Sequence, residues 1–148
     1  MALYESRTEL RCSPQRAFEF LIRPANMQSV APPELGMVFV NPPEVIALGS
    51  KLIFKVQAHG FVQQIEHEVT RFEPIEGFSE KMIKGPLGSW VHDYLLQPAE
   101  HGVTLVNKIA FAPPGGMLGM ILTEQRLRDQ LEEGYHHRSA ALKKALDE

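Results

Sequence analysis

The chain has 148 residues, of which 44% are hydrophobic and 22% are charged, a mixture typical of a globular protein and unlike a disordered one. Its 15 Lys and Arg and 18 Asp and Glu residues give a net charge of −3. This charge argues against non-specific nucleic-acid binding and against electrostatic docking on anionic membranes, because both need an excess of basic side chains. The length predicts a single domain over residues 1–148.

The cysteine content and the distribution of apolar residues indicate the cellular compartment of the protein. Cys12 is the one cysteine, so a disulfide within the chain and a cysteine-based zinc site are both excluded. The first residues show neither a basic segment nor an apolar run, and no apolar run approaches the ~20 residues that span a bilayer. These features predict a cytoplasmic protein without a signal peptide or a transmembrane helix.

The start of the chain predicts a strand and two short helices. Polar and apolar residues alternate over 3–12, which is typical of an edge strand. Ser13 and Pro14 then predict a helix, because serine caps helix N-termini and proline suits the first helical position. Pro24 ends this helix, and a second short helical turn is expected over 25–30.

A period of two predicts a sheet in the middle of the chain. Six further strands are expected at 37–41, 52–58, 64–71, 78–83, 90–96 and 105–111. The first clear turn between them is expected at His59-Gly60. Because the connections between successive strands are short, antiparallel pairing is favoured throughout.

The last part of the chain predicts one long helix. After a Pro-Pro-Gly-Gly break at 113–116, the period becomes helical from about 118 to 146. At 1.5 Å per residue this helix measures roughly 43 Å, and only the sheet can cover its apolar stripe. The order of elements predicts an α+β fold, in which a seven-stranded curved antiparallel sheet wraps around the C-terminal helix, with two short helices after the first strand.

Four segments carry a resemblance that covers nearly the whole chain: SPQRAFEFLIRPANM at 13–27, GPLGSWVHDYLL at 85–96, GVTLVNKIAFAPPGG at 102–116 and YHHRSAALKKAL at 135–146. Together they resemble a bacterial ligand-binding branch of the SRPBCC helix-grip superfamily, which includes START domains, birch-pollen-allergen-like proteins and polyketide cyclases. The resemblance implies a helix-grip fold that encloses a hydrophobic small molecule between sheet and helix. Some members catalyse cyclisation or dehydration there, and others carry lipids or hormones.

Alternation in the strand at 90–96 singles out candidate pocket residues. Trp90, His92, Tyr94 and Leu96 share one face. If that face is concave, an indole N–H, an imidazole and a phenol enter an apolar space, which is the composition of a small-molecule pocket. Two alternatives stay open: these side chains fill a core, or a slipped register turns Asp93 inward instead.

Three other polar residues and one glycine lie in apolar surroundings. His67 is either an acid or base in the cavity or a structural histidine. Asn107 needs a hydrogen-bond partner when buried, either Tyr94, His92, a backbone group, water or a ligand. Arg138, on the apolar stripe of the last helix, either holds a ligand carboxylate or carbonyl, or lays its stem along the sheet with its charge in water. Gly134, one turn earlier, allows a close approach or a bend.

These observations define a predicted ligand site and leave three functions open. The residues expected to contact a ligand are Phe54, His67, Trp90, His92, Tyr94, Asn107, Leu131, Tyr135 and Arg138. Among them, His92, His67 and Tyr94 are the candidates for acid–base catalysis. No cofactor or metal is predicted, because no dinucleotide, Walker or zinc-protease motif is present. The sequence favours a binder of a hydrophobic or aromatic small molecule (a lipid, quinone or polyketide-like compound), over a cyclase- or dehydratase-like enzyme and a partner-binding domain.

Overall fold

The elements of the computed structural model, which describes residues 1–58 and 60–148, follow the predicted order. The first half contains β1 (Ala2–Leu10), α1 (Pro14–Leu21), α2 (Pro24–Val30), the short 3-10 helix η1 (Pro33–Leu35), β2 (Val38–Phe39), β3 (Lys51–Ala58) and β4 (Phe61–Glu73). The second half contains β5 (Gly77–Lys84), β6 (Ser89–Ala99), β7 (Gly102–Ala112), α3 (Gly116–Ile121) and α4 (Glu124–Leu146). The turn predicted at His59-Gly60 includes His59, which lies outside the described residues.

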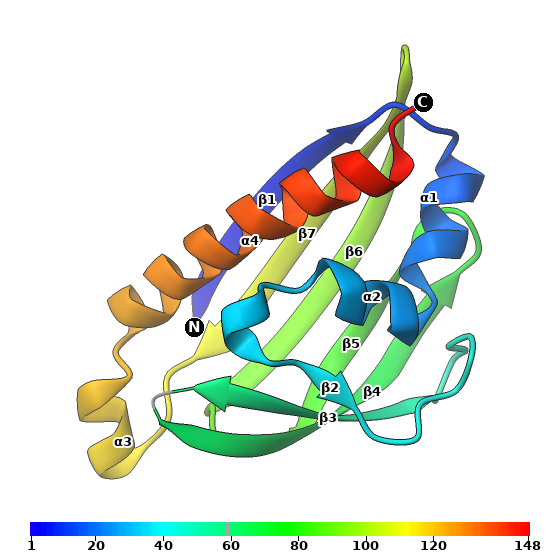
Figure 1. Cartoon of the computed structure of the whole chain (residues 1–148). Helices are drawn as coiled ribbons and strands as arrows, with labels where there is room; N and C mark the ends of the chain where they lie inside the picture. The colour runs from blue at the N-terminus through cyan, green and yellow to red at the C-terminus, as the bar shows by residue number, and fades with distance from the viewer. Residues whose placement is uncertain (59) are drawn as a thin grey trace.

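All the strands form one antiparallel sheet in the order β1-β7-β6-β5-β4-β3-β2. The first strand therefore pairs with the last one. The sheet is curved, and α1, α2 and α4 lie on its concave side (Figure 1). The predicted seven-stranded helix-grip architecture, with short helices after the first strand, is confirmed.

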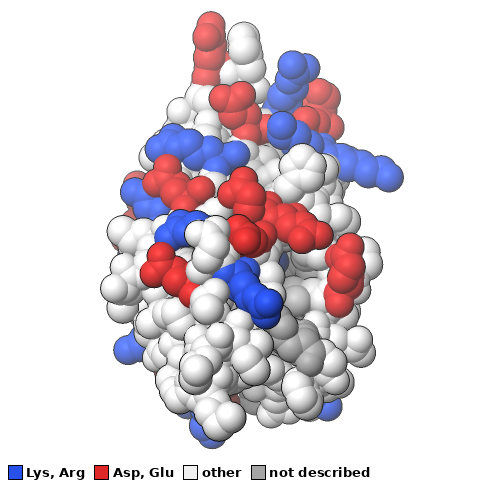
Figure 2. Space-filling view, turned by 90° about the vertical axis from the view of Figure 1, so that its left-hand side faces the viewer, with Lys and Arg blue, Asp and Glu red and all other residues white. Residues whose placement is uncertain are grey.

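The predicted single helix from about 118 to 146 is wrong in one respect, because it is broken into α3 and α4. The hydroxyl of Thr123 accepts a hydrogen bond from the N–H of Arg126 at 3.3 Å and so caps α4. Leu122, between the helices, is buried, whereas Met117 and Met120 of α3 are exposed. The apolar period continues across the break, so periodicity alone does not reveal it. Below the charged side chains in Figure 2, the end of the molecule that carries α3 shows few charges.

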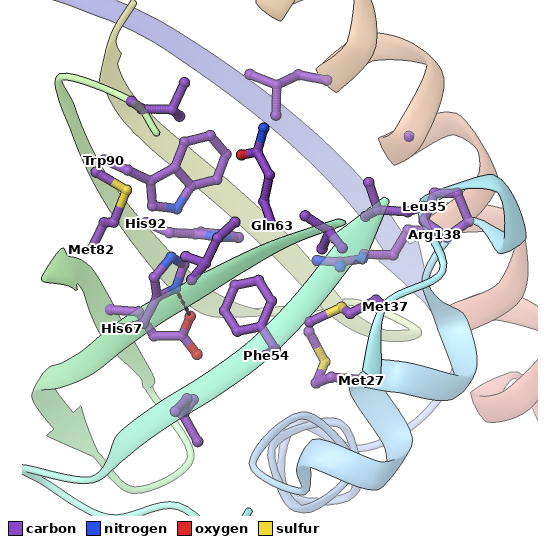
Figure 3. Close-up of a pocket in the computed structure, with 18 of the residues that line it drawn as sticks. Met27, Leu35, Met37, Phe54, Gln63, His67, Met82, Trp90, His92 and Arg138 are labelled. Carbon is purple, nitrogen blue, oxygen red and sulfur yellow. Dashed lines mark hydrogen bonds and ion pairs between the residues drawn. The ribbon is translucent and has the colours of Figure 1, made fainter. Parts of the chain in front are cut away.

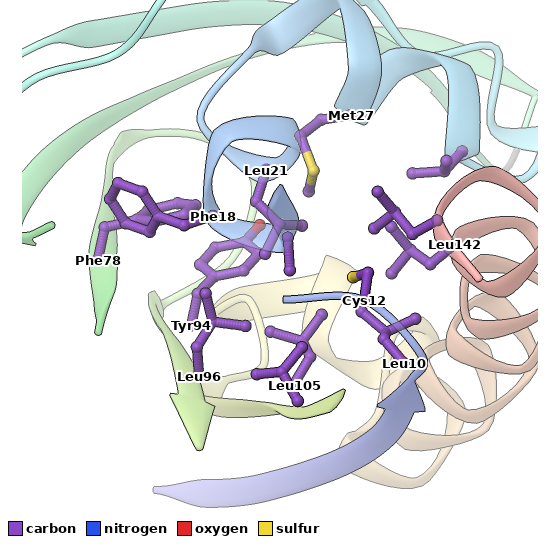
Figure 4. Close-up of a cluster of buried hydrophobic side chains, with 14 of the residues drawn as sticks. Leu10, Cys12, Phe18, Leu21, Met27, Phe78, Tyr94, Leu96, Leu105 and Leu142 are labelled. Carbon is purple, nitrogen blue, oxygen red and sulfur yellow. The ribbon is translucent and has the colours of Figure 1, made fainter. Parts of the chain in front are cut away.

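A hydrophobic cluster fills one end of the concave side (Figure 4). Ser13 caps α1 by accepting a hydrogen bond from the N–H of Arg16 at 3.1 Å, as predicted. Phe18 of α1 then meets the ring of Phe78 edge-on, with 6.4 Å between centroids. Leu142, near the end of α4, belongs to the same cluster. This end of the sheet is therefore closed by packing.

The long helix α4 is attached to the edge strand β1. The hydroxyls of Thr8 and Ser139 are hydrogen-bonded at 2.6 Å, and Arg128 donates to the backbone carbonyl of Leu3 at 2.8 Å. Both contacts lie on the side of the sheet that is farthest from β2. The concave faces of β3 to β6 are therefore left for other side chains to cover.

Two further observations apply to residues 1–58 and 60–148. No helix in this part of the chain combines the length and the apolar character needed to cross a bilayer. Within the same residues, no group of three or more His, Cys, Asp or Glu side chains is placed to hold a metal ion.

Gly77, where β5 begins, provides a test of the sheet geometry. Its φ is 151°, and a Cβ at this position would overlap the backbone carbonyl oxygen of Tyr94. We expect Gly77→Ala to lower the free energy of unfolding by at least about 3 kcal/mol, because backbone must shift in the centre of the sheet. Urea denaturation measures the loss.

Gly49→Ala is the matched control for this substitution. Gly49 also has a positive φ, of 85°, but no atom lies within 4 Å of the added Cβ. Its expected loss is only about 1–2 kcal/mol, from the left-handed conformation alone. Equal losses in the two variants would contradict the overlap at Gly77.

Candidate functional site

A cavity of about 290 Å³ lies between the concave face of the sheet and the helices. Side chains of β3 to β6 form one wall, and α2, η1, β2 and α4 contribute the others. Most of the lining side chains are apolar, and a few polar groups point into the space between the walls (Figure 3). This composition is that of a site for a small molecule.

The structure brings eight of the nine predicted ligand residues to the cavity wall. They are Phe54, His67, Trp90, His92, Tyr94, Leu131, Tyr135 and Arg138. The expected register of the strand at 90–96 is the observed one, since Trp90, His92 and Tyr94 face the cavity. Asp93 has the opposite orientation and accepts a hydrogen bond from Ser79. That these residues bind a ligand stays a prediction.

Asn107 is the exception, because it does not line the cavity. It is 1% exposed and its Oδ1 accepts a hydrogen bond from Nε2 of His92 at 2.9 Å. The hydroxyl of Tyr135 lies 3.3 Å from the same nitrogen. Asn107 and Tyr135 therefore fix the orientation of the imidazole. Asn107 was expected to contact a ligand, but it instead holds His92 and does not itself line the cavity.

His92 is a neutral group in a stack of rings. Burial lowers its pKa to about 4, against the opposing effects of the Glu80 charge and the hydrogen bond to Asn107. The ring of His92 stacks on Tyr94, with centroids 3.8 Å apart, and Tyr94 stacks on Phe78 at 4.2 Å. At pH 7 this part of the wall is consequently flat, aromatic and uncharged.

The phenols of the cavity also stay in their neutral forms. Burial raises the pKa of Tyr135 to about 12, and it raises the pKa of Tyr94 well above its ordinary value. Both hydroxyl groups therefore keep their protons at pH 7 and remain able to donate hydrogen bonds.

Glu80 of β5 is a site residue that the sequence analysis missed. Its Oε2 lies 3.2 Å from Nδ1 of His67, and the two side chains are 13% and 9% exposed. Burial raises the pKa of Glu80, but the hydrogen bond to His67 and the electrostatic effects of His67, His92 and Arg138 outweigh it and hold that pKa below its usual value. The available signal was alternation, which places Glu80 on the same face as the apolar Phe78 and Met82.

Arg138 extends from α4 into the cavity (Figure 3). Its guanidinium carbon lies 5.2 Å from the ring centre of Tyr135, and its Nη1 lies 3.4 Å from the Tyr135 hydroxyl. Burial lowers the pKa of Arg138, but Tyr135, Tyr94 and Glu80 together raise it above its ordinary value. Within the described part of the chain, no carboxylate forms an ion pair with this cation.

The indole nitrogen of Trp90 is a polar atom of the site without a protein partner. It is buried, and it has no hydrogen-bond partner among residues 1–58 and 60–148. The ring lies edge-on to His92, with centroids 6.3 Å apart. A buried N–H that is left unpaired costs about 1–3 kcal/mol.

The depressed pKa of His92 predicts a specific dependence of stability on pH. Between pH 6.5 and 4, the unfolded chain binds a proton at His92 that the folded protein does not bind. Stability from this group is therefore complete above pH 6.5 and is lost as the pH falls through 4, by about 2–3 kcal/mol between pH 7 and 4.5. Urea denaturation at these two pH values measures the loss.

His92→Gln is the comparison for this pH effect, because glutamine does not titrate. The variant should lose less stability than the wild type over the same interval, because carboxyl groups remote from His92 contribute equally to both proteins. Asn107→Ala should lower the pKa of His92 further, since it removes a hydrogen bond that raises it, and NMR of the imidazole reports this directly. An unchanged pH dependence in His92→Gln would contradict the buried neutral imidazole.

Comparison with known proteins bears on the fold. No protein-family model and no curated protein matches the chain. Among solved structures, one from Chromobacterium violaceum is similar at 15% identity and a TM-score of 0.76, over 99% of this chain and 97% of that one. The di-domain ARO/CYC protein StfQ from the steffimycin biosynthetic pathway is similar at 12% identity and a TM-score of 0.73, over 96% of this chain and 49% of StfQ.

A plant protein shows the same arrangement. Ginseng major latex-like protein 151 from Panax ginseng has 12% identity and a TM-score of 0.67, over 95% of this chain and 96% of its own length. At these identities the similarity concerns the fold and not the activity. The chain has the helix-grip fold that its sequence motifs resemble.

Proposed function

We propose that the protein binds a hydrophobic or aromatic small molecule in the cavity between the curved sheet and α4. The observation that carries the proposal is the cavity itself, of about 290 Å³ with mainly apolar walls. Protein interiors are packed densely and contain few voids larger than a water molecule. A space of this size, with an arginine that has no ion-pair partner among the described residues on its wall, supports an occupant.

The shape and chemistry of the wall support a flat ligand. Phe54 and His67 meet edge-on, with centroids 4.9 Å apart, and the rings of Trp90, His92 and Tyr94 follow one another along β6. Aromatic faces bind other rings by stacking and by edge contacts. The methionines on the wall (Met27, Met37 and Met82) have flexible side chains that adapt to the outline of an apolar ligand.

Acid–base catalysis is the second candidate function, as in a cyclase- or dehydratase-like enzyme, and the His67–Glu80 pair favours it. A carboxylate hydrogen-bonded to a histidine orients the imidazole and stabilises its protonated form. His92 and Tyr94 fit this role less well, because their shifted pKa values make them a weak base and a weak acid at pH 7. A catalytic cavity would therefore lose proton exchange at a bound ketone in His67→Gln and retain it in His92→Gln.

Binding is measurable through Trp90, which is the single tryptophan of the chain and lines the cavity. We expect neutral two- and three-ring aromatic compounds such as 2-naphthamide to change its fluorescence in a saturable manner. Gly134→Leu should weaken this binding at least tenfold, because Gly134 lines the cavity and the added side chain would occupy it.

Gly134→Ala is the matched control for the cavity-filling variant. The nearest atom to a Cβ at this position is Cγ of Pro32 at 3.8 Å, an ordinary contact. Alanine should leave binding unchanged and stabilise α4 by up to about 1 kcal/mol. If no aromatic compound changes Trp90 emission, or if leucine and alanine have the same effect on binding, the proposed function is wrong.

A further inference from the structure

We propose that the ligand is an aromatic acid, in which an anionic oxygen pairs with Arg138 while the rings lie against the aromatic side chains of β3 and β6. The inference rests on the proposed function and adds to it the charge and the orientation of the ligand. It follows from which polar groups of the cavity have partners within the protein and which do not.

The charges on the cavity wall are unequally compensated. The ionisable groups that line it are His67, Glu80, His92, Tyr94, Tyr135 and Arg138. The Glu80 carboxylate has a basic partner in His67 at 3.2 Å. Arg138 has no carboxylate partner within the described residues. A cation removed from water is costly unless it is paired, so the missing counter-charge is one that a ligand can supply.

The polar groups of the cavity that are not fully paired are both hydrogen-bond donors. Arg138 presents a planar fork of N–H groups, of which Nη1 contacts the hydroxyl of Tyr135 at 3.4 Å. The indole N–H of Trp90 is buried without a partner among residues 1–58 and 60–148. By contrast, the acceptor Glu80 is hydrogen-bonded to His67. The cavity is therefore short of acceptors, and a guanidinium fork matches the two oxygens of a carboxylate.

The position of Arg138 defines how an acid would lie. The guanidinium enters from α4, whereas Trp90, His92 and His67 come from the opposite wall (Figure 3). The Tyr135 ring holds the guanidinium from one side, at 5.2 Å from its carbon. An anionic group would thus face α4, and the rings would point toward the sheet. Glu80 on the sheet side opposes the reverse orientation by repulsion between like charges.

Three compounds that share one ring system but differ in charge show how much of the binding depends on the charge of the ligand and how much on its shape. They are 2-naphthoate, the neutral 2-naphthamide and the cationic 2-naphthylmethylammonium, titrated at pH 7 against Trp90 fluorescence. We expect the acid to bind at least tenfold more tightly than the amide, in keeping with the strength of charge-assisted hydrogen bonds. The ammonium compound should bind most weakly, since Arg138 repels it.

Variants that remove or keep the charge of residue 138 test whether the preference for the acid comes from Arg138. In Arg138→Gln the advantage of the acid over the amide should fall below threefold. Arg138→Lys keeps the charge and should retain a preference for the acid, although a smaller one. Glu80→Gln removes the negative charge and should strengthen binding of the acid. Arg126→Gln, at an exposed arginine of α4 outside the cavity, should change nothing.

The outcomes distinguish this inference from the proposed function. If acid and amide bind equally well to the wild type, or if the preference survives in Arg138→Gln, the aromatic acid is wrong and the binding function stands. If none of the three compounds changes Trp90 emission, both are wrong. Circular dichroism of Arg138→Gln, or the result with Arg138→Lys, identifies a loss that comes from misfolding rather than from the missing charge.

Discussion

The attachment of α4 to one edge of the sheet is the constraint on which the cavity depends. Thr8 and Ser139 join the middle of α4 to β1, and the N–H of Arg11 donates to Asp147 just after the helix. Seven strands at about 4.8 Å spacing span roughly 29 Å, whereas a helix with its side chains is only about 10–12 Å wide. One helix at the edge cannot cover the concave face. The cluster around Phe18 closes one end, and the remaining space is the cavity.

The polar groups of the cavity fall into two sets, according to whether the protein itself supplies their hydrogen-bond and ion-pair partners. On the sheet side, the protein supplies the partners, because Asn107 binds His92 and His67 binds Glu80. On the opposite side, Arg138 contacts the hydroxyl and the ring of Tyr135 and interacts with the hydroxyl of Tyr94, but it forms no ion pair within the described residues. The first set holds the shape of the wall and needs no ligand. The second carries a charge without an ion-pair partner, so the proposed recognition of a ligand depends on α4.

The sequence predicts those features of the site that depend on residues close together in the chain, and it misses those that depend on contacts between distant elements. The period of two placed Trp90, His92 and Tyr94 on the concave face, because alternation is a property of each strand by itself. The same rule identifies Glu80, which was missed because a charged residue in a strand is ordinarily assigned to the solvent side. The break at Thr123 depends on one hydroxyl group against a continuous apolar period. The sequence left His92 as one of several possible partners of Asn107; that His92 is the partner, and that Asn107 does not line the cavity, depends on how neighbouring strands and α4 are placed.

The environment of the cavity favours binding over proton transfer at neutral pH. An acid or base catalyst works best when its pKa lies near the working pH. Here burial moves the pKa of His92 down to about 4 and that of Tyr135 up to about 12, so both groups become fixed hydrogen-bonding parts of the wall. His67 has a different surrounding, because its Nδ1 lies 3.2 Å from the carboxylate of Glu80. The role of a single pair of residues therefore distinguishes the two candidate functions. A carrier needs His67 and Glu80 only as part of the wall. An enzyme that uses this cavity needs the pair to transfer a proton.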